Sequence, residues 1–391
     1  MKKIAVVTAT RAEYGLLSPV IRELRKHEDE GLRVELIVTG THLNPTYGLT
    51  VTEIQEDGTR IDHEIPISVD SASALDISKN QAEALVKFTA LFSEQNYNAV
   101  ILLGDRYEIL SVAMAAVNTR TPIFHIGGGD TTEGAIDECI RHSVTKMSYL
   151  HFPSNEESRK RIIQLGEAPE RVFNYGSTSI DNILNTATLS KAEAMASVSL
   201  PNERYALCTY HPVTLETGDI RVQINELLNA IRAFPDIDFI ATKSNVDQGG
   251  EIINKLLVQA EEETPNLHVF TSLGARRYLS LMRYAQFVLG NSSSGIIEAP
   301  ALHVPTVNIG DRQKGRLRAE SVIDCASDTS SITSAIKQAM SDEMKARCRS
   351  VVSPYGDGHA AHCIAAKSIE VLRQGIDLKK KFYDIDMEAT S

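Results

Sequence analysis

Residues 290–300 read Gly-Asn-Ser-Ser-Ser-Gly-Ile-Ile-Glu-Ala-Pro, and the apolar run 287–289 before them predicts a buried strand. A strand followed by a Gly/Ser-rich turn and a helix start favours anion binding, because the first backbone N–H groups of a helix lack internal partners and carry partial positive charge. Glu298, one turn into the helix, can accept hydrogen bonds from a vicinal diol such as ribose. The stretch therefore predicts a nucleoside diphosphate site. The alternative interpretation is a capped helix, with a serine at the N-cap and Glu298 stabilising the first turn.

Short aliphatic runs like 287–289 recur along the chain and alternate with longer amphipathic segments. The runs lack polar alternation, which is typical of parallel strands in a sheet that is covered on both faces. The pattern predicts an α/β fold of two doubly wound, Rossmann-like domains that face each other across a cleft. The expected strands are 4–8, 34–39, 99–103, 123–126, 149–152 and 172–173 in the first half, and 205–209, 239–241, 267–270, 287–289 and 306–309 in the second; the expected helices include 16–26, 77–95, 108–118, 222–233 and 250–260.

A polar segment near 189–203 separates the two halves. We expect an N-terminal domain over 1–188 that carries the catalytic residues, and a C-terminal domain over 189–358 that binds the nucleotide. The amphipathic stretch 359–374 is long enough to cross back onto the first domain, so 359–391 is expected to return there. The three lysines 379–381 are interpreted as a solvated end.

Composition excludes several classes of protein. The formal net charge is −11 and the pI is about 5.5, which argues against non-specific binding to nucleic acid or to an anionic membrane. Five scattered cysteines without a Cys-x-x-Cys pair argue against a disulfide framework or a structural zinc site. The apolar run after Met1 is too short for a signal peptide, and no run approaches transmembrane length. We expect a cytoplasmic protein.

Polar residues follow most of the expected strands, where ligands bind in open α/β sheets. In the first half these are Arg11, Glu13, Tyr14, His42, Asp105, Arg106, Asp130 and Glu133; in the second half they are His211, Lys243, Ser292, Ser293 and Arg312.

Residues 137–142 read Asp-Glu-Cys-Ile-Arg-His, so Glu138 lies one helical turn from both Arg141 and His142. Carboxylates beside cationic groups near one strand end are groups that enzymes commonly use for acid–base catalysis. The alternative is an exposed helix with salt bridges. No cluster has metal-ligand spacing, and the first strand–helix turn is Thr-Ala-Thr-Arg rather than Gly-x-Gly-x-x-Gly. We therefore expect neither a metal nor a dinucleotide cofactor.

Several of these segments, taken together and in order, resemble the UDP-N-acetylglucosamine 2-epimerase family, in particular its hydrolysing branch in sialic acid synthesis. The resemblance spans the chain. The motifs that carry it are TRAEYG at 10–15, TGTH at 39–42, GDR at 104–106, DECIRH at 137–142, HPVT at 211–214, GNSSSG at 290–295, GDRQ at 310–313 and YGDG at 355–358.

The resemblance implies a fold like that of the GT-B glycosyltransferases, with UDP in the cleft, no cofactor, and a homodimer or homotetramer. It also implies roles by position. Asp105, Glu138 and His211 match catalytic positions; Arg11, Ser292, Ser293, Glu298 and Arg312 match UDP-binding positions; His42, Arg106, Asp130 and Arg141 match residues that line the sugar or phosphate site. Where parts of the family carry Glu or His, this chain has Gly127. Asp130, Asp137 or Glu138 is then the candidate base at C2.

The implied reaction converts UDP-N-acetylglucosamine and water to N-acetylmannosamine and UDP through 2-acetamidoglucal. The alternative substrate is UDP-N,N'-diacetylbacillosamine, used for legionaminic acid. Two other interpretations stay open: a GT-B glycosyltransferase, which would need an acceptor, and a nucleotide-sugar sensor that binds without turnover.

Overall fold

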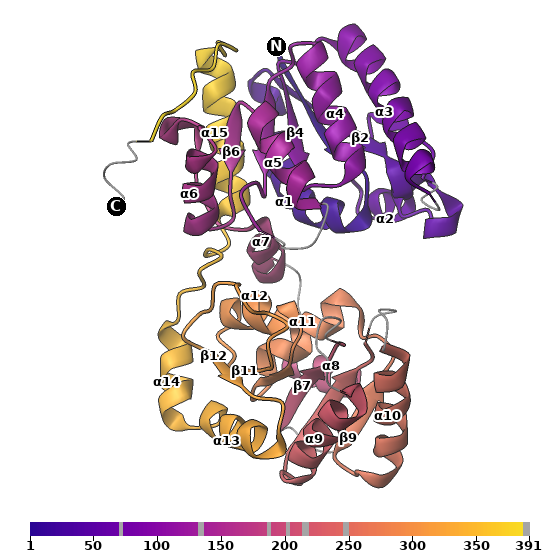
Figure 1. Ribbon diagram of the computed structural model, residues 1–391, viewed down its shortest axis with the longest axis vertical. Helices are drawn as coiled ribbons and strands as arrows, with labels where there is room; N and C mark the ends of the chain where they lie inside the picture. The colour runs from indigo at the N-terminus through magenta and orange to yellow at the C-terminus, as the bar shows by residue number, and fades with distance from the viewer. Residues whose placement is uncertain are drawn as a thin grey trace. The chain divides into compact units, whose positions relative to one another are not determined.

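The computed structural model describes residues 1–69, 73–131, 137–185, 189–200, 204–212, 219–244 and 250–385. The chain divides into two compact units: unit 1 comprises Met1–Asn182 and Gly358–Ser391, and unit 2 comprises Ile183–Asp357. Each unit is built on one six-stranded sheet, and the strand pairings are parallel (Figure 1). The predicted α/β class with two doubly wound sheets is confirmed.

The sheet of unit 1 has the order β3-β2-β1-β4-β5-β6. Its strands are β1 (Lys2–Thr8), β2 (Leu32–Thr39), β3 (His63–Ile65), β4 (Ala99–Leu103), β5 (Ile123–Ile126) and β6 (Leu150–Phe152). The order reverses between β1 and β4, which are direct neighbours through the pairing of Ile4 with Ala99. In open α/β sheets such a reversal marks the crevice where ligands bind, beyond the carboxyl ends of the strands.

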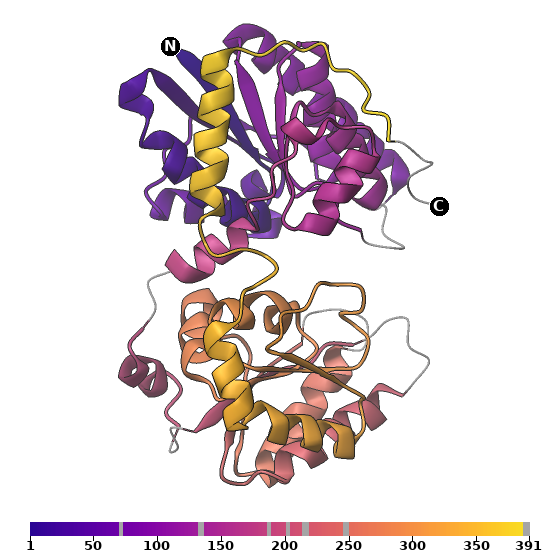
Figure 2. The same ribbon diagram turned by 90° about the vertical axis from the view of Figure 1, so that its left-hand side faces the viewer.

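Helices cover both faces of this sheet. One face is covered by α1 (Arg11–Arg25) and α15 (Ala360–Gln374), which pack side by side (Figure 2). The other face is covered by α3 (Ala74–Gln95), α4 (Tyr107–Asn118) and α5 (Asp137–Met147). The shorter helices of unit 1 are α2 (Val51–Glu56), α6 (Glu156–Gln164) and α7 (Thr178–Asn185), the last of which continues into unit 2.

Strand β1 explains why the strands lack polar alternation. Ile4 and Val6 pack into the core beside α1 and α15, whereas Ala5 and Val7 pack into the core beside α3 and α4. All four side chains are fully buried. Burying a valine or isoleucine side chain contributes about 1.5–3 kcal/mol, so a polar residue on either face of β1 would be costly.

The segment after α15 returns along unit 1 and is anchored there. The Tyr383 amide donates to the carbonyl oxygen of Gly166 over 3.0 Å, and Lys380 Nζ lies 2.8 Å from Glu167 Oε2. Lys380 also donates to the backbone oxygens of Lys146 and Ser148. The interpretation of lysines 379–381 as a solvated end is therefore wrong for Lys380, which is bound to unit 1. The sequence pattern did not reveal this contact, because Glu167 lies far from Lys380 in the sequence.

The sheet of unit 2 has the order β12-β11-β10-β7-β8-β9, with the reversal between β10 and β7. Its strands are β7 (Tyr205–Thr209), β8 (Asp238–Thr242), β9 (Leu267–Phe270), β10 (Val288–Gly290), β11 (Thr306–Ile309) and β12 (Val322–Cys325). Its helices are α8 (Lys191–Ala196), α9 (Ile220–Arg232), α10 (Gly250–Glu263), α11 (Gly274–Tyr284), α12 (Ser293–Ala301), α13 (Thr329–Ala339) and α14 (Asp342–Ser350).

Three strand predictions differ from the structure. The expected strand at 172–173 is reduced to a single bridge between Val172 and His151. Strands β3 and β12 were not predicted. Both lie at a sheet edge and are only partly buried, so their sequences lack the continuous apolar run that marks the central strands.

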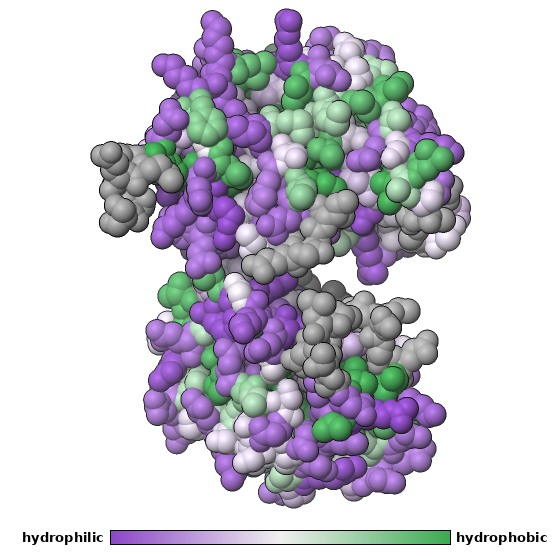
Figure 3. All heavy atoms as spheres, in the orientation of Figure 1, coloured by the Kyte–Doolittle hydropathy of each residue, from purple (hydrophilic) through white to green (hydrophobic). Residues whose placement is uncertain are grey.

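The surface of unit 1 is mixed in character. Apolar side chains gather among polar ones over α3 and α4 (Figure 3), where Leu75, Val86, Met114 and Val117 are exposed. Within the described ranges, no helix has both the length and the apolar character needed to span a bilayer.

Candidate functional site

The anion site predicted at 290–300 has the expected backbone. Strand β10 ends at Gly290, and α12 starts at Ser293 with Ser292 at its N-cap. The Ser292 hydroxyl accepts a hydrogen bond from the Ser294 amide over 3.4 Å. Capping and anion binding are compatible, because a cap satisfies one of the free amides at a helix start and leaves others for a ligand.

Glu298 lies one turn into α12 and is half-buried. Burial raises the pKa of its carboxyl group, and a hydrogen bond with Ser294 partly opposes that rise. Tyr278 on α11 is close enough to feel the Glu298 charge, and burial raises the pKa of its phenol to about 12. The sequence analysis missed Tyr278, because nothing in the pattern of α11 separates a tyrosine near the site from a core aromatic residue.

Asn291 joins three loops at the carboxyl edge of the second sheet. Its side chain accepts from the His211 amide over 2.7 Å and donates to the His211 carbonyl oxygen over 2.8 Å. Its own carbonyl oxygen accepts from Arg312 over 3.1 Å and from Gln313 over 2.9 Å. Asn291 therefore ties the loops after β7 and β11 to the start of α12, a role that its place in a Gly/Ser-rich motif did not reveal.

Gly290 is required for this junction. Its φ is +129°, and a Cβ at this position would lie 2.0 Å from the Thr209 carbonyl oxygen. Because that atom belongs to the backbone of β7, a side chain could be accommodated only by moving the strand.

His211 is 7% exposed, and its Nδ1 lies 3.1 Å from the Ser244 hydroxyl. Ser244 is held in turn by Asn254 of α10, which accepts from the Ser244 amide over 2.7 Å. The imidazole is thus oriented from outside its own loop, as a ligand-binding or catalytic histidine requires.

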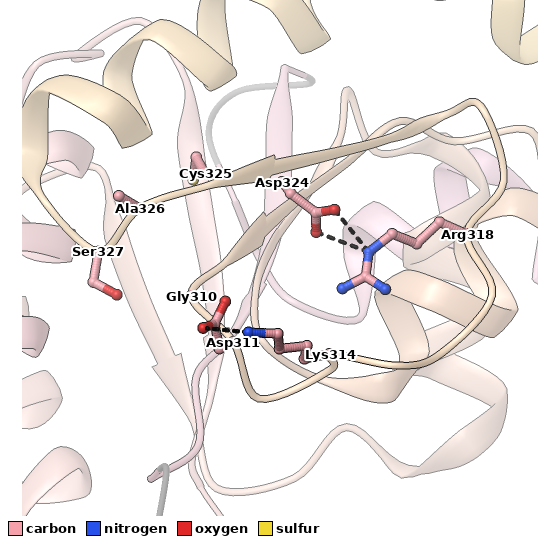
Figure 4. Close-up of a pocket in the computed structure, with 8 residues that line it drawn as sticks. All are labelled: Gly310, Asp311, Lys314, Arg318, Asp324, Cys325, Ala326 and Ser327. Carbon is pink, nitrogen blue, oxygen red and sulfur yellow. Dashed lines mark hydrogen bonds and ion pairs between the residues drawn. The ribbon is translucent and has the colours of Figure 1, made fainter. Parts of the chain in front are cut away.

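A cavity of about 670 Å³ opens at the carboxyl ends of β11 and β12 (Figure 4). Two ion pairs line it: Arg318 Nε lies 2.7 Å from Asp324 Oδ2, and Lys314 Nζ lies 3.7 Å from Asp311 Oδ2. None of the predicted site residues is among the side chains that line it. Since its cations are already matched by carboxylates, we do not assign the nucleotide to this cavity.

In unit 1, Arg141 links two of the predicted residues. Its Nε donates to Asp105 Oδ2 over 2.8 Å, a second guanidinium nitrogen contacts the same oxygen, and NH1 donates to the Asp130 backbone oxygen over 2.7 Å. Arg141 is 5% exposed. The partner of Asp105 is thus Arg141, 36 residues away, rather than the adjacent Arg106.

The carboxylate of Asp130 has a structural partner set. Its Oδ1 accepts from the Ser158 hydroxyl, from Asn155 Nδ2 at 3.3 Å and from the Ser154 hydroxyl at 3.5 Å. Asn155 is the N-cap of α6. Asp130 therefore fixes the start of α6 to the loop after β5. These hydrogen bonds occupy one carboxylate oxygen of Asp130, a candidate base.

Two of the three glycines before Asp130, Gly128 and Gly129, are required by close packing. A Cβ on Gly129 would lie 2.3 Å from the Ser158 backbone oxygen, at a φ of +83°. The absence of a side chain at Gly129 thus serves the approach of this loop to α6, whereas a Cβ on Gly128 would lie 2.8 Å from the Thr145 hydroxyl and one on Gly127 would meet open space.

Glu138 lies in the first turn of α5, and Asp137 is the first residue of that helix and is exposed. Glu138 Oε1 lies 3.7 Å from His142 Nε2, one turn further along, and the side chain of Glu138 is 28% exposed. The predicted i,i+4 relationship is present, and the carboxylate is partly open to solvent.

The two other arginines among the predicted site residues of unit 1 each pair with a carboxylate. Arg106 is held by the buried Glu108, with NH2 3.0 Å from Oε1 and Nε 3.2 Å from Oε2. Arg11 Nε lies 2.8 Å from Glu53 Oε2, and the Arg11 side chain is 73% exposed. Arg11 is thus an accessible cation at the start of α1.

His42 is fully buried and bonded on both ring nitrogens, to Thr8 over 3.0 Å and to Thr50 over 2.8 Å. Burial lowers its pKa to about 4. His42 is therefore neutral at pH 7, and its place beyond β2 makes it a support for the β1 turn rather than a cation for phosphate.

Glu13 on α1 is 5% exposed, and its Oε2 accepts from the Ala9 amide over 2.7 Å. Desolvation raises the pKa of this carboxyl group to about 8; the Ala9 hydrogen bond and the charge of Arg106 oppose the rise, and the charge of Glu108 adds to it. Glu13 was expected among the residues after the first strand, without an assigned role.

The structure thus brings Asp105, Asp130 and Arg141 together in unit 1, and His211 and Arg312 together through Asn291 in unit 2. Glu133, Val213 and Thr214 lie outside the described residues. Among the residues that are described, no group of His, Cys, Asp or Glu has the geometry of a metal site.

Comparisons with known proteins agree on one family. Residues 22–368 match the family model described as UDP-N-acetylglucosamine 2-epimerase. The chain is 39% identical over 396 residues to polysialic acid biosynthesis protein P7 of Escherichia coli, with 100% of both chains covered. It is 40% identical over 347 residues to a GDP/UDP-N,N'-diacetylbacillosamine 2-epimerase (hydrolyzing) of Campylobacter jejuni, with 88% of this chain and 89% of the relative covered.

A solved structure has the same fold. The UDP-GlcNAc 2-epimerase from Neisseria meningitidis, bound to UDP-GlcNAc, aligns with a TM-score of 0.78 at 19% identity, covering 95% of this chain and 100% of that chain. At this identity the likeness bears on the fold alone and not on the ligand.

Proposed function

Because the chain belongs to the UDP-N-acetylglucosamine 2-epimerase family, we propose that it is a hydrolysing 2-epimerase that converts UDP-N-acetylglucosamine and water to N-acetylmannosamine and UDP. The observation that carries this proposal is the 39% identity, over the whole chain, to a protein of polysialic acid biosynthesis. N-acetylmannosamine is the sugar that a sialic acid pathway would take from such an enzyme.

The proposed nucleotide site is the carboxyl edge of the unit 2 sheet. The N-terminus of α12, with Ser292 and Ser293, offers amide and hydroxyl donors to the diphosphate, and Glu298 accepts from the ribose hydroxyls. His211 and Arg312 add donors from the neighbouring loops. Charge-assisted hydrogen bonds contribute about 1.5–3 kcal/mol each, so a few of them stabilise a departing diphosphate substantially.

The proposed reaction has two steps, an elimination and a hydration. In the first, the C1–O bond to UDP breaks, its electron pair stays on the β-phosphate oxygen, and a carboxylate removes the proton from C2, which leaves 2-acetamidoglucal. In the second, water adds its hydroxyl group to C1 and a proton returns to C2 on the opposite face. Breaking the C1–O bond first makes the C2 proton acidic enough for a carboxylate.

We assign the proton transfers to Glu138 and Asp105 rather than to Asp130. Asp130 uses one carboxylate oxygen for three donors at the start of α6, which favours a positioning role. Glu138 is partly open to solvent, and Asp105 is oriented by Arg141. Arg141 thus holds one proposed proton-transfer group at a fixed place beyond β4.

The second candidate substrate is UDP-N,N'-diacetylbacillosamine, supported by the 40% identity to the Campylobacter jejuni relative. The two sugars differ at C4 and C6, and the same elimination chemistry serves both. Cytoplasmic location and assembly into a homodimer or homotetramer remain predictions.

The decisive experiment is turnover of the two UDP-sugars side by side, without an acceptor, with the products identified by NMR. We expect UDP and free N-acetylmannosamine, with the higher kcat/KM for UDP-N-acetylglucosamine. A higher kcat/KM for the diacetylated sugar would assign the chain to legionaminic acid synthesis. A UDP-linked C2 epimer as the end product would indicate a reversible epimerase. Failure to release UDP without an acceptor would favour a glycosyltransferase.

A further inference from the structure

The segment after α15 runs across unit 1 (Figure 2) and is anchored at the C-terminal ends of two helices. We call residues 377–383 the C-terminal strap. Its Lys380 Nζ donates to the carbonyl oxygens of Lys146 and Ser148 over 2.8 Å each, at the end of α5. The same ammonium group lies 2.8 Å from Oε2 of Glu167, just beyond the end of α6. Lys146 Nζ lies 2.7 Å from the other oxygen of Glu167. One carboxylate therefore joins the strap to the ends of both helices.

Polar contacts rather than apolar burial hold the C-terminal strap. Its large apolar side chains stay open to solvent, since Leu378 is 46% exposed and Phe382 is 61% exposed. The side chain of Lys380, by contrast, is 20% exposed, and that of Glu167 is fully buried. An ammonium group beside a buried carboxylate makes strong charge-assisted hydrogen bonds, and a cation is also favoured at the C-terminal end of a helix. Lys380 is therefore a specific attachment of the strap to unit 1.

The N-terminal ends of the same two helices meet at the loop after β5. From α5, Arg141 NH1 donates to the Asp130 backbone oxygen over 2.7 Å, and Arg141 Nε donates to Asp105 Oδ2 over 2.8 Å. From α6, the N-cap Asn155 donates to Asp130 Oδ1 over 3.3 Å, and the Ser158 hydroxyl donates to the same oxygen. The two helices are thus joined twice, at this loop and at the carboxylate that holds the strap.

Helix α5 connects the strap to the proposed catalytic residues. Glu138 and Lys146 lie about two turns apart on this helix, or about 12 Å at a rise of about 1.5 Å per residue. The contacts of Arg141 fix one point of α5, and a second point sets its direction. Lys380 fixes that second point on the backbone, at a carbonyl oxygen of the last turn, whereas Lys146 reaches Glu167 only through a flexible side chain. Without Lys380 we expect α5 to pivot about Arg141, which displaces Glu138.

We propose that Lys380 is a positioning residue for the proton transfers: it fixes the C-terminal ends of α5 and α6 and thereby holds Glu138 and Arg141 in the geometry that the elimination requires. The inference rests on the proposed function, because Glu138 and Asp105 are proton-transfer groups only in that reaction. The nucleotide is assigned to unit 2, so Lys380 acts on the chemical step and not on UDP binding. A strap that only stabilised unit 1 would leave the chemical step of the folded protein unchanged.

The test is Lys380→Met, which keeps an unbranched side chain and removes its donors. Glu167 keeps Lys146 and His151 as partners, so its charge stays compensated. With the proposed substrate, kcat should fall about tenfold, since a displacement of about 1 Å in an active site can cost about a hundredfold. The dissociation constant of UDP, measured by calorimetry, should not change. Lys380→Arg keeps a cation with several donors and should retain most of kcat.

Two controls separate position from stability, with all rates measured well below the unfolding midpoint of every variant. Lys379→Met changes the exposed neighbour of Lys380 on the strap and should leave kcat, UDP affinity and thermal stability as in the wild type. Leu372→Val removes a methylene group from a side chain of α15 that is 2% exposed. It should lower thermal stability, because it leaves a small cavity in the core, without lowering kcat.

Tyr383→Pro is a milder strap variant that keeps the test decisive if Lys380→Met does not fold. It removes the amide that donates to the Gly166 carbonyl oxygen over 3.0 Å, so kcat should fall by a smaller factor than in Lys380→Met. Wild-type protein that neither binds UDP nor releases it from the sugar would contradict the proposed function itself. If the wild type is active, a wild-type kcat in either folded strap variant, or an equal loss of kcat in Leu372→Val, would overturn only the role of Lys380.

Discussion

Arg141 donates from Nε to Asp105 Oδ2 over 2.8 Å and from NH1 to the backbone oxygen of Asp130 over 2.7 Å. One buried guanidinium on α5 therefore fixes the chain beyond β4 and beyond β5 at the same time. The geometry of the proposed catalytic carboxylate depends on this side chain, although Arg141 was expected only to line the sugar or phosphate site.

Replacing Arg141 by Met should lower kcat at least about a hundredfold while UDP still binds, because Asp105 loses its orientation and Asp130 loses a donor. The free energy of unfolding should fall by about 1–3 kcal/mol, the cost of an unsatisfied buried group. Steady-state kinetics, calorimetry with UDP and thermal unfolding provide the three measurements. Arg347→Met, which breaks an exposed pair with Glu343 on α14, is the control and should leave all three nearly unchanged. A kcat within twofold of wild type would remove Arg141 from the mechanism.

Glu138→Gln and Asp130→Asn should behave differently in heavy water. The wild type should give product with deuterium at C2, because the returning proton comes from solvent. Glu138→Gln should abolish release of UDP from the sugar, whereas Asp130→Asn should retain it, because an asparagine Oδ1 can still accept from Ser158 and Asn155. If Asp130→Asn is inactive but folded, Asp130 is the base. Product without C2 deuterium in the wild type would exclude the glucal route.

Glu298→Ala should weaken UDP binding about tenfold, the value of one charge-assisted hydrogen bond, with little change in thermal stability without ligand. Burial raises the pKa of Glu298, so its ionisation costs folding free energy as pH rises, and its removal relieves that cost. Glu343→Ala, an exposed residue of α14 paired with Arg347, is the control. A large loss of stability with unchanged UDP affinity would assign Glu298 to capping alone.

Glu167 should make the protein sensitive to acid. Burial acts to raise its pKa, and hydrogen bonds from His151, Lys146 and Lys380 outweigh it and lower the pKa to about 2. Its contribution to stability is therefore complete above pH 4.5 and is lost as the pH falls towards 2. Glu167→Gln should cost about 2 kcal/mol at pH 7, and less as the pH falls below 4.5. Denaturant unfolding at several pH values measures both effects, and a cost that does not depend on pH would refute the ion-pair origin.

Activity should not need a metal. Prolonged dialysis against a strong chelator is expected to leave kcat unchanged, since the proposed mechanism stabilises the departing diphosphate with amides, hydroxyls and cationic side chains. Restoration of a lost activity by one divalent metal, and not by others, would show that a metal site had been overlooked.

The central strands were predictable because burial on both faces leaves a direct mark in the sequence. Ile4–Val7 and 99–103 are apolar without interruption, and their short length and β-branched residues favour buried strands over a buried helix segment. Strand β3 (His-Glu-Ile) carries no such mark, because an edge strand of three residues takes its conformation from its neighbour β2. Val172 reads as a strand residue but has only one bridging partner.

The candidate site could be proposed from residue types, but its contacts could be predicted only in part. Polar residues after strands identify the carboxyl edge, so Asp105, Ser292 and Glu298 could be named as candidates, and their roles stay predictions. Which partner each residue takes depends on contacts across long sequence separations, such as Asp105 with Arg141 or Asn291 with His211, and a periodic pattern does not encode these. The burial of Glu13 and the anchoring of Lys380 also depend on segments that are far apart in the sequence, so the sequence pattern did not reveal them.

Unit 1 is formed by two stretches of chain, Met1–Asn182 and Gly358–Ser391, that flank the continuous unit 2. A ribosome therefore completes every residue of unit 2 before it adds α15, the helix that covers Ile4 and Val6 together with α1. During synthesis, part of one apolar face of the unit 1 sheet stays uncovered until α15 has been made, whereas unit 2 can already fold. The nascent protein is thus most exposed to aggregation, and most in need of a chaperone, in the interval before residues 360–374 emerge.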